Sequence, residues 1–166
     1  MSIPEEINLA IISKNACIII LLTYNEIIMS KSKIFFNYYL PPLLLAVIIF
    51  YLSSIPNLQS GLPSTFDLVL RKIAHMGEYG LLVILLLRMF FNNEEIKRDL
   101  KTGTVKHQNM LYLEIIAAGI LVTLLYALSD EFHQVFVPGR SGSLWDAGID
   151  FIGIVIGTVI YDRKRW

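Results

Sequence analysis

Apolar residues run through the chain in long stretches, and four of these stretches approach the length of a membrane span. A helix needs about 20 mostly apolar residues to cross the hydrocarbon core of a bilayer. Such stretches lie at residues 34–52, 70–91, 110–128 and 144–161. Because backbone polar groups inside a bilayer must be satisfied within the protein, the pattern predicts an all-α integral membrane bundle of four transmembrane helices.

The composition supports a membrane protein and narrows its partners. Hydrophobic residues make up 55% of the 166 residues and charged residues 17%, whereas an average soluble domain is ~25% charged. Lysine and arginine together number 14, as do aspartate and glutamate, so no overall basic field would attract nucleic acid. The single cysteine excludes an internal disulfide. We therefore expect a multi-pass protein of the cell membrane whose partners are membrane lipids, and no nucleic acid.

The first 30 residues form an N-terminal extension whose nature the sequence leaves open. The apolar run at residues 16–22 is too short to span a bilayer, and no cleavage site of small residues follows it. One interpretation is an extra helix, and the other is an artefact upstream of a start at Met29, where a basic Met-Ser-Lys-Ser-Lys begins. The four-helix membrane domain is then expected at residues 31–161, followed by a basic cytoplasmic tail at 162–166.

Basic residues outside the spans predict the orientation of the bundle. They collect before the first span, between the second and third spans, and after the fourth span: Lys31, Lys33, Lys97, Arg98, Lys101, Lys106, Arg163, Lys164 and Arg165. In a four-span protein these three places share one side of the membrane, and positive residues favour the cytoplasm. The N and C termini of the four-span unit are therefore expected to be cytoplasmic, with the loops at 53–69 and 132–143 facing outward.

Ionisable residues are rare inside membrane spans and usually mark a functional site. In this chain they gather at the expected outer ends of the second, third and fourth spans, so the topology brings three stretches to one membrane depth. The candidate site residues are Lys72, His75, Glu78, Tyr79, Asp130, Glu131, His133, Gln134, Arg140, Ser141, Asp146 and Asp150. A structural alternative is that the charges only pair with one another and hold the helices together.

Some of these residues suit catalysis. The candidate catalytic residues are His75, Glu78, Asp130, Glu131, His133 and Asp146. In that role one of the two histidines acts as general base, with Glu78 or Glu131 as its partner or as the acid. The chain would then be a hydrolase or transferase directed at a lipid or an envelope substrate. A membrane scaffold or binding protein without catalysis stays open as the alternative.

The remaining candidates suit the binding of a substrate. They are Lys72, Tyr79, Gln134, Arg140, Ser141 and Asp150. The cations Arg71, Lys72 and Arg140 are expected to contact phosphate, with arginine binding in bidentate fashion. At the outer leaflet this predicts a lipid head group or a lipid-linked envelope precursor.

A metal-dependent intramembrane enzyme is a further alternative. His75-x-x-Glu78 and Asp130-x-x-His133 each place a histidine and a carboxylate on one helical face. Zinc, manganese or iron accepts such ligands. The main expectation is a site without a cofactor, and the divalent metal is kept as the alternative.

Glycines on the fourth span predict how that span packs. Asp146 and Asp150 are four residues apart, and Gly153 and Gly157 continue the same helical face. A pair of small residues at this spacing lets two membrane helices approach closely. Close packing at these glycines would aim both aspartates into the bundle.

Several motifs follow one another in the order typical of one membrane protein family. Residues 71–79 (RKIAHMGEY) and 129–134 (SDEFHQ) resemble the K-x-x-H-x-x-E-Y and D-E-x-H-Q elements of VanZ-like proteins. Residues 138–146 resemble the P-G-R-x-x-S-x-x-D turn of that family, and residues 150–157 its closing [N/D]-x-x-G-x-x-x-G helix. The resemblance covers about residues 31–161.

This resemblance implies a fold, a location and a biological setting. It implies four membrane helices and a polar site that faces outward. The founding member of the family gives low-level resistance to teicoplanin, a glycopeptide that binds cell-wall precursors. The resemblance therefore implies an envelope substrate and a role in glycopeptide tolerance.

Overall fold

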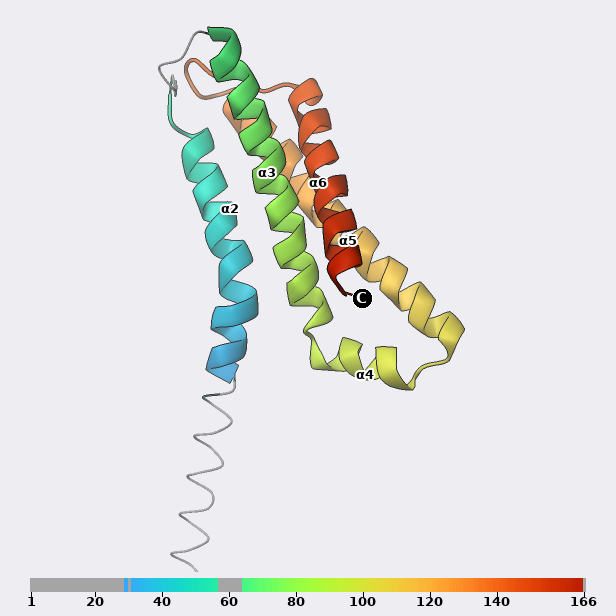
Figure 1. The fold of residues 1–166 in the computed structure, drawn as a ribbon. Coiled ribbons are helices and arrows are strands. Elements are labelled where there is room, and N and C mark those ends of the chain that lie inside the picture. The colour runs from blue at the N-terminus through green and yellow to red at the C-terminus, as the bar shows by residue number, and fades with distance from the viewer. Residues whose placement is uncertain (1–28, 30, 57–63, 166) are drawn as a thin grey trace, which may run out of the picture. The chain divides into compact units, whose positions relative to one another are not determined.

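The computed structural model describes residues 29, 31–56 and 64–165, and every regular element in them is helical. The elements are η1 (Phe35–Tyr39), α2 (Leu40–Ser53), α3 (Ser64–Phe91), α4 (Glu94–Thr102), α5 (Val105–Gln134) and α6 (Leu144–Arg165), as Figure 1 shows. This confirms the all-α prediction. The two interpretations of residues 1–30 lie outside the described residues, Met29 excepted.

Within residues 31–56 and 64–165, four helices are long and apolar enough to cross a membrane. They span Lys31–Ser53, Val69–Phe91, Val105–Gln134 and Leu144–Lys164, and each contains almost all of one stretch expected from the sequence. Each of the four spans predicted from the apolar stretches is therefore confirmed, and the chain is a multi-pass membrane protein. The third helix runs farther than its apolar stretch, because the polar residues at its end continue the helix to Gln134.

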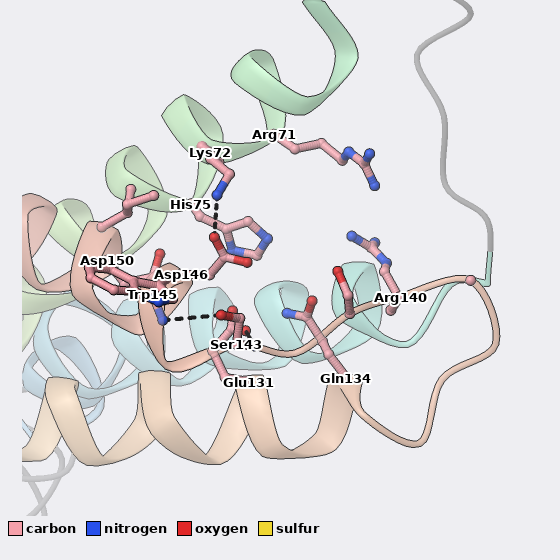
Figure 2. A pocket seen from close by; sticks show the side chains of 13 residues that line it. Arg71, Lys72, His75, Glu131, Gln134, Arg140, Ser143, Trp145, Asp146 and Asp150 are labelled. Atoms are coloured by element: carbon pink, nitrogen blue, oxygen red, sulfur yellow. Dashed lines mark hydrogen bonds and ion pairs between the residues drawn. The ribbon is translucent and has the colours of Figure 1, made fainter. Parts of the chain in front are cut away.

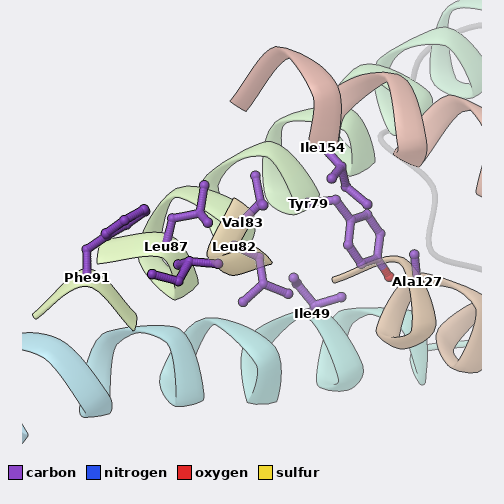
Figure 3. Packing of buried hydrophobic residues seen from close by; sticks show 9 residues of the cluster. Ile49, Tyr79, Leu82, Val83, Leu87, Phe91, Ala127 and Ile154 are labelled. Atoms are coloured by element: carbon purple, nitrogen blue, oxygen red, sulfur yellow. The ribbon is translucent and has the colours of Figure 1, made fainter. Parts of the chain in front are cut away.

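The chain divides into two compact units, of which residues 40–166 form the larger. In the smaller unit, the ring of Phe35 stacks on that of Tyr39 with centroids 6.5 Å apart. In the larger unit, α2, α3, α5 and α6 share one core. Its buried residues are Ile49, Tyr79, Leu82, Val83, Leu87, Phe91, Ile115, Ala127 and Ile154, most of which are drawn in Figure 3.

Helices α3 and α6 touch backbone to backbone at glycines. A Cβ atom added to Gly153 would collide with the carbonyl of Met76, and one added to Gly157 would collide with the carbonyl of Gly80. From the other side, a Cβ atom on Gly80 would lie 2.9 Å from the carbonyl oxygen of Gly153. The predicted close packing at Gly153 and Gly157 is therefore confirmed, and α3 is the helix that they meet.

Outward-facing side chains of the larger unit are mostly apolar. Leu43, Val47, Leu81, Leu125 and Ile156 are all exposed on the surfaces of their helices. In a protein dissolved in water such a surface would drive aggregation, but in a bilayer it faces lipid tails.

The polar ends of three helices meet at one end of this unit. Figure 1 shows that α3 begins, α5 ends and α6 begins beside one another, with the end of α2 close by. The charged connection of α4 lies at the opposite end. The fold thus brings together the three polar stretches that the sequence places at one membrane depth.

The glycine contact generates a prediction for stability. Gly153→Ala places a methyl group against the Met76 carbonyl and forces α3 and α6 apart, which should cost about 1–3 kcal/mol. Thermal unfolding of the detergent-purified protein measures this loss. Gly148→Ala is the matched control on α6, because nothing lies within 4 Å of an added Cβ there. Equal unfolding temperatures for Gly153→Ala and the unmodified protein would contradict the close contact.

Candidate functional site

A cavity of about 480 Å³ opens at the polar end of the larger unit, between the start of α3, the end of α5 and the start of α6. Figure 2 shows the side chains that line it. They are Arg71, Lys72, His75, Glu131, Gln134, Gly139, Arg140, Ser141, Ser143, Trp145, Asp146, Ile149 and Asp150. The volume falls within the range of roughly 300–1,000 Å³ that is typical of small-molecule sites.

Most residues proposed from the sequence line this cavity. They are Lys72, His75, Glu131, Gln134, Arg140, Ser141, Asp146 and Asp150. The other four do not line it: Glu78, Tyr79, Asp130 and His133. The structure therefore separates a set of residues that a ligand can contact from a set that lies behind or beside the cavity.

Asp130 lies buried behind the cavity and joins α5 to α2. Its Oδ2 accepts hydrogen bonds from Ser53 Oγ at 2.7 Å and from Gln134 Nε2 at 2.9 Å. Asp130 is 2% exposed. The side chain of Ser53 was not expected from the sequence to take part, since a serine at the end of an apolar span gives no such signal. Asp130 thus positions Gln134, which lines the cavity.

His133 and Tyr79 also lie away from the cavity. The Nε2 atom of His133 is 3.0 Å from Ser54 Oγ, and its ring stacks on Phe50 with centroids 4.6 Å apart. His133 therefore faces α2. Tyr79 is fully buried in the core, and its ring lies 6.2 Å from that of His75. Tyr79 therefore packs beside His75 and is not placed to contact a ligand in the cavity.

Glu131 caps the N-terminus of α6. Its Oε2 accepts a hydrogen bond of 2.8 Å from the backbone N–H of Ser143, and Ser143 Oγ accepts one of 3.1 Å from the N–H of Trp145. Backbone N–H groups at a helix start have no partner within the helix, so these contacts stabilise it. A carboxylate from α5 thereby fixes where α6 starts and where Asp146 and Asp150 lie.

An ion pair between Lys72 and Asp146 connects α3 to α6 at the cavity wall. Both side chains are partly exposed, at 36% and 28%. Partly exposed ion pairs contribute little to stability. The charges of Lys72 and Asp146 therefore offset each other at the cavity wall. A ligand that separates the two side chains would lose little stabilising energy by doing so.

His75 is the histidine in the cavity wall, and a carboxylate lies beside it. Its Nδ1 is 3.5 Å from Glu78 Oε2, one helical turn away on α3. The two groups lie within ion-pair distance, but His75 Nδ1 has no hydrogen-bond partner among the described residues. Of the two histidines proposed from the sequence, His75 is the one that a ligand in the cavity can meet.

Two guanidinium groups face each other at one end of the cavity. Figure 2 shows Arg71 reaching from α3 and Arg140 from the loop between α5 and α6. Arg140 donates to the carbonyl oxygen of Leu52 at 2.8 Å, which caps the end of α2. Burial lowers the pKa of Arg140 from its ordinary value, the nearby charge of Arg71 lowers this pKa further, and the carboxylates of Asp130, Glu131 and Glu78 act in the opposite direction. An anion between the two guanidinium groups could accept hydrogen bonds from both.

Arg71 keeps a donor free for a ligand. Its NH2 nitrogen pairs with Asp67 Oδ2 at 2.9 Å. Its Nε–H is buried and has no hydrogen-bond partner within the described part of the chain. An unpaired buried donor beside a second cation favours an anion in the cavity.

Trp145 and Ile149 also line the cavity, although neither was predicted from the sequence to do so. Trp145 is 85% exposed at the start of α6. From the sequence, a tryptophan near the end of a span is expected only to lie at the membrane interface. Its place at the cavity follows from the turn that Glu131 and Ser143 fix, which depends on contacts distant in sequence.

The residues of the metal alternative are not arranged as a metal site. Across the described ranges, no three histidine, cysteine, aspartate or glutamate side chains are placed to hold a metal ion. His75 and Glu78 lie together on α3, whereas Asp130 bonds to Ser53 and His133 faces α2. This donor set does not fit a shared metal.

Comparisons with known proteins give one result. The model of the VanZ/LLP1 family matches residues 16–165, which is nearly the whole chain. The match begins within the segment that the sequence pattern placed in an N-terminal extension. Neither a curated protein nor a solved structure matches the chain.

Proposed function

We propose that this chain, which belongs to the VanZ/LLP1 family, binds the phosphate-bearing head group of a membrane lipid or a lipid-linked envelope precursor at the outer face of the cell membrane. The observation that carries the proposal is the pair of guanidinium groups of Arg71 and Arg140, which face each other at one end of the cavity. A phosphate between them would offset their mutual repulsion and accept bidentate hydrogen bonds from each.

The position of the cavity supports a ligand that comes from the membrane. The cavity lies where three spanning helices begin or end, and large apolar side chains are exposed on the same ends of α5 and α6, such as Phe132 and Leu144. A head group can reach this place while its acyl or prenyl chains stay among lipid tails. Head-group binding therefore accounts for a polar cavity on an otherwise apolar bundle.

The distribution of basic residues supports the outer face. Lys97, Arg98 and Lys101 lie on α4, at the end of the unit opposite the cavity. Because positive residues favour the cytoplasm, α4 is expected there and the cavity outside. This orientation gives the site access to envelope precursors after they have crossed the membrane.

Catalysis on the bound lipid is a second candidate, favoured by the His75–Glu78 pair. With Glu78 orienting its ring, His75 would take a proton from an attacking hydroxyl group or water during hydrolysis or transfer at the head group. Binding without catalysis requires no such pair. His75→Gln separates the two, because catalysis requires the imidazole whereas phosphate binding relies on the arginines.

The proposed orientation predicts which loops an impermeant maleimide can label in intact cells. In a Cys17→Ser background, Ser141→Cys should react from outside, whereas Lys101→Cys on α4 should react only after permeabilisation. Both positions are exposed in the structure. Labelling of Lys101→Cys in intact cells, with Ser141→Cys protected, would reverse the orientation and contradict action at the outer face.

Phosphate recognition predicts that lipid affinity depends on Arg71. We expect the detergent-purified protein to bind dihexanoyl phosphatidylglycerol, and Arg71→Gln to weaken binding about tenfold, because about 1.4 kcal/mol of charge-assisted hydrogen bonding is lost. Thermophoresis or calorimetry measures the dissociation constants. Arg88→Gln is the matched control, since Arg88 is on α3 outside the cavity. Equal affinities for Arg71→Gln and Arg88→Gln would contradict the proposal.

Glycopeptide tolerance is the proposed physiological consequence. A protein that binds a lipid-linked precursor at the outer face would change the access of teicoplanin to that precursor. We expect a Gram-positive host that expresses the protein to tolerate more teicoplanin, and Arg71→Gln to abolish the gain at equal membrane levels. Susceptibility assays measure both. If the host with the unmodified protein in its membrane is as susceptible to teicoplanin as the host without it, the protein has no role in glycopeptide tolerance.

A further inference from the structure

Asp150 is a buried carboxylate in the wall of the cavity. It lies on α6, one turn after Asp146, and is 1% exposed. Its Oδ2 is buried and has no hydrogen-bond partner among the residues that the structure describes. Leaving a buried acceptor unpaired is unfavourable, so a donor supplied by a ligand would stabilise this part of the cavity.

The charged groups that interact most strongly with the Asp150 carboxyl group are other carboxylates. They are Glu131, Asp130, Asp146 and Glu78. All four have partners in the protein. Asp146 pairs with Lys72, and Glu131 accepts from the Ser143 N–H. Asp130 accepts from Ser53 and Gln134, and Glu78 lies 3.5 Å from His75. A region of several carboxylates attracts a cation more strongly than a neutral donor.

Asp150 and the two arginines lie at different ends of the cavity, and the remaining cation of the wall, Lys72, pairs with Asp146. Figure 2 shows Asp150 and Asp146 on the side formed by α6, and Arg71 with Arg140 on the opposite side. Arg71 has an unpaired buried Nε–H on one side, and Asp150 has an unpaired buried oxygen on the other. A ligand with a positive and a negative group would satisfy both.

We propose that the head group is zwitterionic, with its phosphate between Arg71 and Arg140 and its protonated amine donating to Asp150. This inference rests on the proposed function and narrows its substrate class. A lipid with a phosphoethanolamine-like group has this chemistry. An anionic head group without an amine fills only the arginine side and leaves the Asp150 oxygen unpaired.

The test compares two lipids that differ in the charge of the amine and in one acetyl group. Dihexanoyl phosphatidylethanolamine and its N-acetyl derivative share the phosphate and the chains, but the derivative carries no cation. We expect the full-length, detergent-purified protein to bind the free amine about tenfold more tightly. Asp150→Asn should reduce this preference to less than twofold. Asp162→Asn, the same substitution at the opposite end of α6, should keep it.

Each outcome bears on a different part of the account. Equal affinity of the unmodified protein for the two lipids overturns the zwitterion inference but leaves phosphate recognition standing. Failure to bind either lipid overturns both. If Asp150→Asn does not fold, the comparison of the two lipids on the unmodified protein still decides. Binding of soluble O-phosphoethanolamine as tightly as the lipid would support the charge arrangement and contradict the need for a lipid anchor.

Discussion

The backbone contact between α3 and α6 is the constraint on which the site depends. Because Gly153 and Gly157 have no side chains, α6 lies directly against the carbonyl groups of Met76 and Gly80. His75 directly precedes Met76 on α3, and Asp150 lies three residues before Gly153 on α6. The glycines therefore hold cations of α3 and carboxylates of α6 at the walls of one cavity, which larger residues would force apart.

Polar side chains at this end of the unit divide into two groups by what they contact. Asp130, Glu131 and Arg140 bond to groups of the protein itself: a serine hydroxyl, the start of α6 and the end of α2. Arg71, His75 and Asp150 line the cavity, and each keeps a buried atom without a hydrogen-bond partner in the described residues. Asp130 also keeps one unpaired oxygen, but it does not line the cavity. The first group builds the cavity and the second leaves polar atoms of its wall without partners, which is why we assign ligand binding to the second group. Arg140 belongs to both, since its charge faces Arg71 while it caps α2.

Much of this arrangement could be predicted from the sequence, for physical reasons that apply to membrane proteins. The apolar stretches fix the number of helices, and a short connection between spans fixes which ends meet. Helical spacing then places His75, Asp146 and Asp150 near one another. What the sequence could not give is the direction of individual side chains where a helix has polar residues on more than one face. His133 turned toward Phe50 and Ser54, and Asp130 toward Ser53, because contacts with α2 decide their positions.

A lipid whose phosphate-bearing head group occupies the cavity should remain bound when the protein leaves the cell. Native mass spectrometry of the protein, extracted from its membrane in a mild detergent, detects such a ligand without a prior choice of lipid. We expect a phospholipid or lipid-linked phosphate bound one to one, with occupancy that falls sharply in Arg71→Gln and not in Arg88→Gln. A protein that carries no such lipid, or carries it equally in both variants, would show that the cavity does not bind a lipid phosphate.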